Sequence, residues 1–139
     1  MLHDPANDPP MDWPLRADAR RVRARHDWWV IEHGTGPEVL LLHGAGGSGH
    51  SFRSLAPALE GLRCLIPDLP GQGFTRAGSR GRFGIQPMAE DVAALIAAAG
   101  WKPTLVIGHS AGVPLALQLS TLVPFRGVIG LNAALGQFD

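Results

Sequence analysis

Short apolar runs alternate with helix-like segments along most of this chain, and this alternation restricts the possible folds more than any other feature. Continuous apolar runs, which are typical of strands buried on both faces, occupy 39–42, 64–66, 105–107 and 128–131. Segments with apolar residues at helical spacing lie between them, at 52–59, 85–99 and 113–123. Because such alternation forms parallel sheets with helices on their faces, we expect an α/β fold with a mostly parallel, doubly wound sheet.

Two more strands are expected before the first of these runs, at 22–25 and 28–32, joined by a turn at His26 and Asp27. The residues before them are polar and rich in proline. We therefore expect a flexible lead-in over 1–15, attached through Trp13, and one domain over 16–139.

Three residues mark the ends of the expected helices. Gly100 follows the last apolar residue of the second helix, as a C-terminal glycine does. Ser54 is expected to cap the first helix, because Pro57 then falls in the first turn, where proline is tolerated.

Composition excludes several classes of function. Twelve basic and twelve acidic residues give no net charge, so nothing favours nucleic-acid binding. The one cysteine, Cys64, lies in an apolar run and is expected to be a small buried hydrophobe, not a metal ligand. The start of the chain lacks the pattern of a signal peptide, and no apolar run approaches the roughly 20 residues of a membrane span. We expect a cytoplasmic protein without a metal or other cofactor.

The segment Val106–Gly112 reads VIGHSAG and is typical of a strained turn between a strand and a helix. Gly108 and Gly112 are expected to lack side chains because the neighbouring strand and helix pass close by. Ser110, at the apex, is expected to be a catalytic nucleophile, and the simpler alternative is a serine that caps the helix.

Two backbone N–H groups are expected to form an oxyanion hole beside this serine. One belongs to Ala111, at the start of the helix. The other belongs to Ala45, which follows Gly44 in the loop His43–His50 at the end of a neighbouring strand. In a parallel sheet these loops meet at the same edge, together with the loop Asp68–Arg76.

Other polar residues in these loops have more ordinary interpretations. His43 is expected to shape its loop by bonding the backbone, and Asp68 to brace its loop as a hydrogen-bonded structural acid. His109 is expected to pack or to line a pocket, and His50 to be a solvated loop residue.

The first loop also supports a competing interpretation. Gly44, Gly46 and Gly49 fit the G-x-G-x-x-G pattern, and Asp68 follows at about the position of a ribose-binding acid. A dinucleotide-binding fold usually opens with this motif, however, and here two strands precede it. The pattern also leaves the glycines around Ser110 unexplained.

Together, three motifs make the chain resemble the α/β-hydrolase fold family over about residues 20–139: LLLHGAGGSGHSF, IPDLPGQGFT and VIGHSAG. Four stretches are also similar to the magnesium chelatase accessory group of bacteriochlorophyll biosynthesis: MDWPLR, DLPGQGFT, GHSAGVPLALQL and LNAALGQF. The resemblance implies a role near magnesium insertion into protoporphyrin IX. A serine at the apex argues against the haloalkane dehalogenase branch, which has an aspartate there.

The rest of a serine triad is not apparent in these residues. The family order is serine, then acid, then histidine, but no histidine follows Ser110, and the only later acid is Asp139. We therefore expect an N-terminal part of the fold, truncated after about the sixth strand, with the triad acid and base outside this chain and little activity by itself.

Three functions remain open from the sequence. The first is a serine hydrolase that acts on an ester or similar acyl bond of a small molecule. The second is a non-enzymatic accessory factor that binds a tetrapyrrole or contacts magnesium chelatase subunits. The third, with least support, is a dinucleotide binder.

Overall fold

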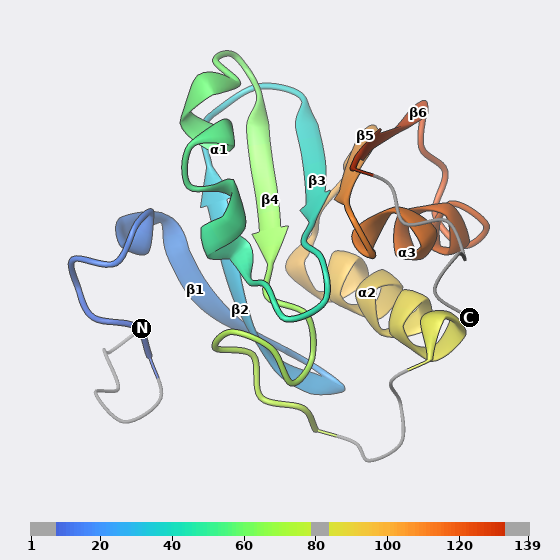
Figure 1. The fold of residues 1–139 in the computed structure, drawn as a ribbon, viewed down its shortest axis with the longest axis horizontal. Coiled ribbons are helices and arrows are strands. Elements are labelled where there is room, and N and C mark those ends of the chain that lie inside the picture. The colour runs from blue at the N-terminus through green and yellow to red at the C-terminus, as the bar shows by residue number, and fades with distance from the viewer. Residues whose placement is uncertain (1–7, 79–83, 133–139) are drawn as a thin grey trace.

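The computed structural model describes residues 8–78 and 84–132, and it contains a six-stranded mixed sheet with helices on its faces (Figure 1). The strands are β1 Ala19–Ala24, β2 His26–His33, β3 Glu38–Leu42, β4 Arg63–Pro67, β5 Leu105–His109 and β6 Gly127–Leu131. The helices are η1 Arg16–Asp18, η2 Gly49–Phe52, α1 Leu55–Ala58, α2 Ile85–Ala99 and α3 Gly112–Leu119.

The strand order in the sheet is β1-β2-β4-β3-β5-β6. The pairs β1–β2 and β2–β4 are antiparallel, whereas β3 pairs in parallel with β4 and β5, and β5 with β6. The predicted α/β class and the parallel sheet from residue 39 onward are therefore confirmed. Since β3, β4 and β5 point the same way, the loops that follow them meet at one edge of the sheet.

Alternating residues of the strands fill two apolar layers, one on each face of the sheet. Leu40 and Leu42 of β3 face the layer that contains residues of α2 and α3. Val39 and Leu41 of the same strand face the layer that contains residues of η2 and α1. Because β3 is buried on both sides, its sequence is a continuous apolar run.

Cys64 belongs to the second layer, where it is fully buried. Burial raises the pKa of its thiol above the ordinary range. The predicted role as a buried hydrophobe is confirmed.

The first two strands differ from the prediction. They run over 19–24 and 26–33, and the turn between them is Arg25, at φ 65°, instead of His26 and Asp27. The apolar pattern could not give these limits, because Val22 is the one buried residue of β1 and the others are arginines and alanines. Antiparallel pairing with β2 determines the length of this strand.

The first predicted helix is divided into η2 and the four residues of α1. Ser54 does not act as the expected cap: its backbone is already helical (φ −98°, ψ −35°), and its side chain makes no capping hydrogen bond. Pro57 does lie in the first turn, as predicted. The helix ends at the next residue, Ala58, and Leu59 has left the helical conformation.

The C-terminal ends of α2 and α3 each have a local cause. Gly100 ends α2 in the left-handed region, at φ 72°, as predicted. The third helix ends at Leu119, before the predicted Val123. The hydroxyls of Ser120 and Thr121 donate to the carbonyls of Leu117 and Gln118, which offers the last turn an alternative to further helix.

The described part of the proline-rich lead-in packs against the domain. Asp8 forms an ion pair with Arg21 at 2.9 Å, and both side chains are largely buried. The ring of Trp13 lies 4.5 Å from that of His50, so the predicted attachment through Trp13 is confirmed. Residues 1–7, 79–83 and 133–139 lie outside the description, and so do Asp139 and most of the LNAALGQF motif. No helix in the described ranges is long and apolar enough to cross a membrane.

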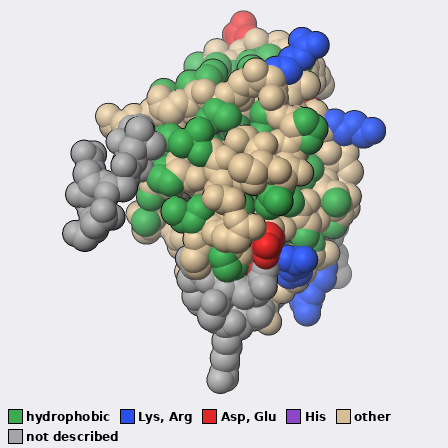
Figure 2. Space-filling view, turned by 90° about the vertical axis from the view of Figure 1, so that its right-hand side faces the viewer, with side chains coloured by type: hydrophobic (Ala, Val, Ile, Leu, Met, Phe, Trp, Pro, Cys, Tyr) green, Lys and Arg blue, Asp and Glu red, His purple; other side chains and the backbone are tan. Residues whose placement is uncertain are grey.

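Strand β6 lies at one edge of the sheet as described. Figure 2 shows hydrophobic side chains gathered on this side of the molecule. On β6, α3 and the turn that follows α3, exposed apolar residues are Leu117, Leu122, Ile129 and Leu131.

Candidate active site

Ser110 lies at the sharp turn between β5 and α3, with its backbone in the left-handed region at φ 54°. A residue with a side chain is strained there by roughly 1–2 kcal/mol. The turn is held from both sides, because the Ser110 N–H donates to the carbonyl of Leu131 (2.8 Å) and its carbonyl accepts from Val113 N–H (3.1 Å). A strained residue that the surrounding structure holds in place is typical of a functional turn.

The glycines of the motif allow the backbones around this turn to approach closely. A Cβ on Gly108 would lie 2.5 Å from the Gly112 carbonyl oxygen. A Cβ on Gly112 would lie 2.3 Å from the Leu42 oxygen and 2.9 Å from that of His43. The predicted reason for these glycines is therefore confirmed: the helix start packs directly against the end of β3, which leaves no room for a side chain.

Gly44 brings the loop after β3 against the serine. A Cβ on Gly44 would lie 3.2 Å from Ser110 Cβ and 3.7 Å from Ser110 Oγ. Any larger residue would therefore press on the serine side chain. The structure thus places the two predicted loops side by side at this point.

Two backbone donors next to Ser110 are unused. Among the described residues, neither the Ala45 N–H nor the Ala111 N–H donates a hydrogen bond to another protein group. Both residues are exposed. Free donors at a helix start and in an adjoining loop favour a developing negative charge.

His43 is fully buried directly before this loop. Its Nδ1 donates to the Gly44 carbonyl (2.7 Å), so Nε2 is the acceptor for the Leu69 N–H (2.9 Å). Burial lowers the pKa of this imidazole, while the bond to Gly44 and the charge of Asp68 act in the opposite direction. Since both ring nitrogens serve the loops, the prediction that His43 shapes its loop is confirmed.

Asp68 braces the other side of the same region. Its two carboxylate oxygens accept from the N–H groups of Gly49 (2.6 Å) and Phe74 (2.8 Å). Burial raises the pKa of this carboxyl, although these hydrogen bonds lower it. The predicted bracing role is confirmed. The same bonds weaken the dinucleotide interpretation, because both oxygens are already occupied by the loop backbone.

Gln72 is a site residue that the sequence analysis missed. Its side-chain oxygen accepts from the Gly46 N–H at 2.8 Å, which ties the loop after β4 to the loop that carries Ala45. A polar side chain between Gly71 and Gly73 was the available signal. Its partner lies 26 residues away, so the contact could not be found from local pattern.

The remaining loop histidines lie around the turn without a bond to the serine. The Ser110 hydroxyl has no hydrogen-bond partner among the described residues. His109 is partly buried, and the ring of His50 packs on Trp13 and receives a contact from Arg53 (3.2 Å). His50 is therefore part of the attachment of the lead-in instead of a freely solvated residue.

Comparisons of the sequence point to one family. Residues 37–133 match the model of a family described as alpha/beta hydrolase fold. The Magnesium-chelatase 30 kDa subunit of Rhodobacter capsulatus is 50% identical over 134 residues, which is 94% of this chain and 47% of that protein. Epoxide hydrolase B of Mycobacterium tuberculosis is 31% identical over 102 residues, 70% of this chain and 29% of that protein.

Solved structures agree with this fold. The epoxide hydrolase VrEH1 of Vigna radiata has a TM-score of 0.74 at 30% identity, over 81% of this chain and 37% of that one. The protein Cfl2 of Burkholderia cenocepacia has a TM-score of 0.78, over 84% and 42%. At 24% identity, this second likeness concerns the fold alone. The chain spans about half the length, or less, of the curated relatives that it matches.

Proposed function

Because the chain belongs to the α/β-hydrolase fold family, we propose that it supplies the nucleophile and the oxyanion-binding loops of a serine hydrolase that acts on an ester or similar acyl bond. One observation carries this proposal. Ser110 is held in a strained turn, its hydroxyl has no protein partner among the described residues, and two unused N–H donors flank it. A serine that merely caps a helix needs neither the strain nor a second loop beside it.

In the proposed reaction, Ser110 Oγ attacks the acyl carbon and gives up its proton to a base. The carbonyl oxygen becomes an oxyanion, which the N–H groups of Ala45 and Ala111 stabilise. The alcohol leaves with a proton from the base, and water then hydrolyses the acyl-serine. The chain spans about half, or less, of its relatives' length. We propose that the histidine base and its acid lie in a part of the full-length protein that corresponds to the rest of that length.

A fluorophosphonate probe tests the nucleophile, since it phosphonylates activated serines. We expect the full-length protein to be labelled, and Ser110→Ala to abolish the labelling. Ser54→Ala is the control, because Ser54 is exposed, makes no capping bond and lies outside the Ser110 turn. Labelling that survives in Ser110→Ala, or that is absent from the intact protein, would overturn the proposal.

A second candidate is favoured by the 50% identity to a magnesium chelatase subunit. In this case the chain is a non-enzymatic accessory factor, which binds a tetrapyrrole or contacts chelatase subunits in the cytoplasm. Titration with protoporphyrin IX distinguishes the two candidates. A spectral shift that survives Ser110→Ala supports the accessory role, and the absence of any shift counts against porphyrin binding.

A further inference from the structure

A second polar site lies at the tip of the β1–β2 hairpin. Because β2 runs antiparallel to β4, this tip lies at the edge of the sheet where β4 ends, as does the Ser110 turn. The chain after β4 returns past this tip, where Arg76 forms an isolated antiparallel bridge with Asp27 (Figure 1). Backbone hydrogen bonds in both directions join the two residues, at 3.0 and 2.9 Å. The hairpin and the returning loop therefore form one frame.

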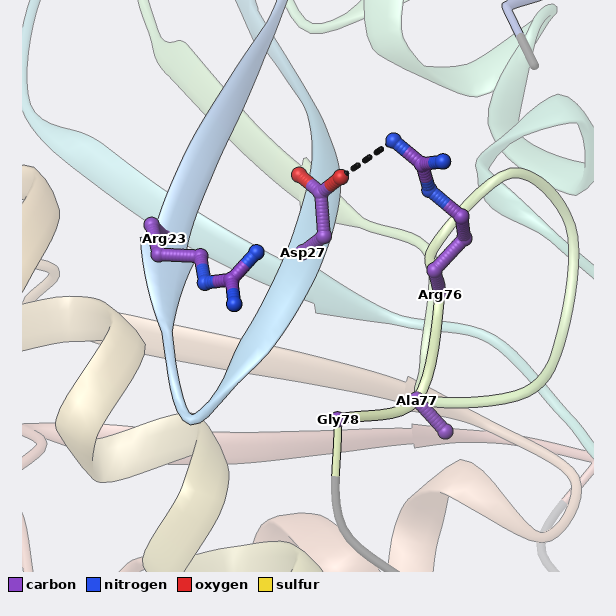
Figure 3. A pocket seen from close by; sticks show the side chains of 5 residues that line it. All are labelled: Arg23, Asp27, Arg76, Ala77 and Gly78. Atoms are coloured by element: carbon purple, nitrogen blue, oxygen red, sulfur yellow. Dashed lines mark hydrogen bonds and ion pairs between the residues drawn. The ribbon is translucent and has the colours of Figure 1, made fainter.

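A pocket of about 280 Å³ opens in this frame, lined by Arg23, Asp27, Arg76, Ala77 and Gly78. Figure 3 shows Arg23 and Arg76 on either side of Asp27, with the backbone of Ala77 and Gly78 below. Two guanidinium groups and one carboxylate give the lining a net positive charge.

Most arginines around this pocket form an ion pair with a described residue, but Arg23 does not. Neighbouring arginines each have a carboxylate partner: Arg20 with Glu32, Arg21 with Asp8, Arg25 with Asp91, and Arg76 with Asp27. Among the arginines around this pocket, Arg23 alone has no carboxylate partner within the described residues, although Asp27 is its direct cross-strand neighbour. The carboxylate of Asp27 is directed to Arg76 instead, at 2.6 Å.

The Gly78 backbone, which forms the lower wall of the pocket, is fixed from behind. The Gly78 N–H donates to His26 Nδ1 (2.8 Å), and His26 Nε2 in turn donates to the buried carboxylate of Asp91 (2.6 Å). A Cβ on Gly78 would lie 2.1 Å from the Arg25 carbonyl oxygen, so the loop is pressed onto the hairpin here. The pocket is therefore preorganised by buried contacts, and its free guanidinium faces solvent.

We propose that this pocket binds the oxyanion group of a small-molecule ligand, a carboxylate or a phosphate, with Arg23 as its main donor. The planar guanidinium offers two parallel N–H donors, which match the geometry of both groups. Arg76 adds positive charge on the other side, and its bond to Asp27 keeps it in position. This inference is independent of the nucleophilic role of Ser110.

Titration of the full chain with phosphate and, separately, with succinate tests the site at constant ionic strength. The amide NMR signals of Ala77 and Gly78 report on the pocket. We expect at least one of the two anions to give saturable shifts, and Arg23→Gln to weaken its binding about tenfold, as expected for the loss of a charge-assisted hydrogen bond. Arg126→Gln is the matched control, because Arg126 is also exposed but lies outside the pocket, directly before β6.

The two anions separate the possible sources. Tighter binding of phosphate assigns the site to a phosphorylated ligand, and tighter binding of succinate to a carboxylic acid. Two outcomes overturn the inference: shifts that do not saturate and are matched by chloride, or equal binding by wild type and Arg23→Gln.

Discussion

At the scale of single residues, the site combines strain with unused hydrogen-bonding groups. Ser110 holds a positive φ that a glycine would adopt at no steric cost, and the chain has a serine there nonetheless. A residue kept at a cost in stability is expected where its side chain has a chemical role.

This cost leads to a prediction about stability. Ser110→Gly should unfold with a free energy about 0.5–1 kcal/mol higher than that of Ser110→Ala, because alanine retains the left-handed strain. Urea denaturation of the two variants measures the difference. A Ser110→Ala variant that is equally stable or more stable would show that the turn is not strained.

The buried His43 leads to a prediction about pH. Burial lowers the pKa of His43 below its ordinary value of about 6.5. As the pH falls through that value, this histidine is therefore protonated in the unfolded chain before it is protonated in the folded chain. The free energy of unfolding should therefore fall between pH 7.5 and 5.5. The raised pKa of Asp68 acts in the opposite sense, because its contribution is lost as the pH rises through that pKa.

A pair of variants isolates the contribution of His43. His43→Asn should be less stable than wild type at pH 7.5 and should lose part of the pH dependence. His50→Asn, which changes a partly exposed imidazole, should retain it. Urea midpoints at the two pH values provide the measurement. If the change in midpoint between pH 7.5 and 5.5 is the same in His43→Asn as in wild type, the assignment to His43 is contradicted.

At the scale of the elements, the sequence predicted most of the strands and helices but not how they meet. Strand burial and helix termination leave local patterns. The apolar runs at 39–42 and 105–107 therefore predicted β3 and β5, and Gly100 predicted the end of α2. Contacts such as His26 with Asp91, or Gln72 with Gly46, join residues 65 and 26 positions apart and leave no local pattern.

The junction between β3 and α3 gives a prediction at this scale. Gly112→Ala should lower the free energy of unfolding by about 1–3 kcal/mol, because its Cβ would overlap backbone atoms of Leu42 and His43. Gly127→Ala is the matched control, since its Cβ would meet a flexible Leu105 methyl group at 3.2 Å. We expect the control to change stability by less than about 1 kcal/mol. Equal effects of the two substitutions would contradict the close approach at Gly112.

For the candidate site, the sequence singled out the loops but not the contacts that support them. The motif GHSAG and the loop HGAGG indicated Ser110, Ala45 and Ala111, and the structure brings these residues together. The contact of Gln72 with Gly46, and the partner of the predicted Trp13 attachment, His50, could be found only from the structure.

At the scale of the whole molecule, the described sheet has an edge strand with exposed apolar side chains. Ile129 is 45% and Leu131 is 38% exposed on β6. Edge strands of this kind tend to pair with other chains.

A polypeptide of these 139 residues is therefore expected to self-associate through β6. Ile129→Lys should lower this association, because a charge on an edge strand opposes pairing. Met11→Lys is the control, since Met11 is exposed in the lead-in, outside the sheet. Sedimentation velocity over a range of concentrations measures the effect. A monomeric wild type, or equal effects of both substitutions, would contradict the prediction.

If Ser110 is an activated nucleophile, it must form a covalent adduct with a reagent for activated serines. The full-length protein from its native host is treated with a fluorophosphonate, and its intact mass and peptide map are measured. We expect one adduct, on the peptide that contains Ser110. A protein with no adduct, or with an adduct on another residue, would contradict it.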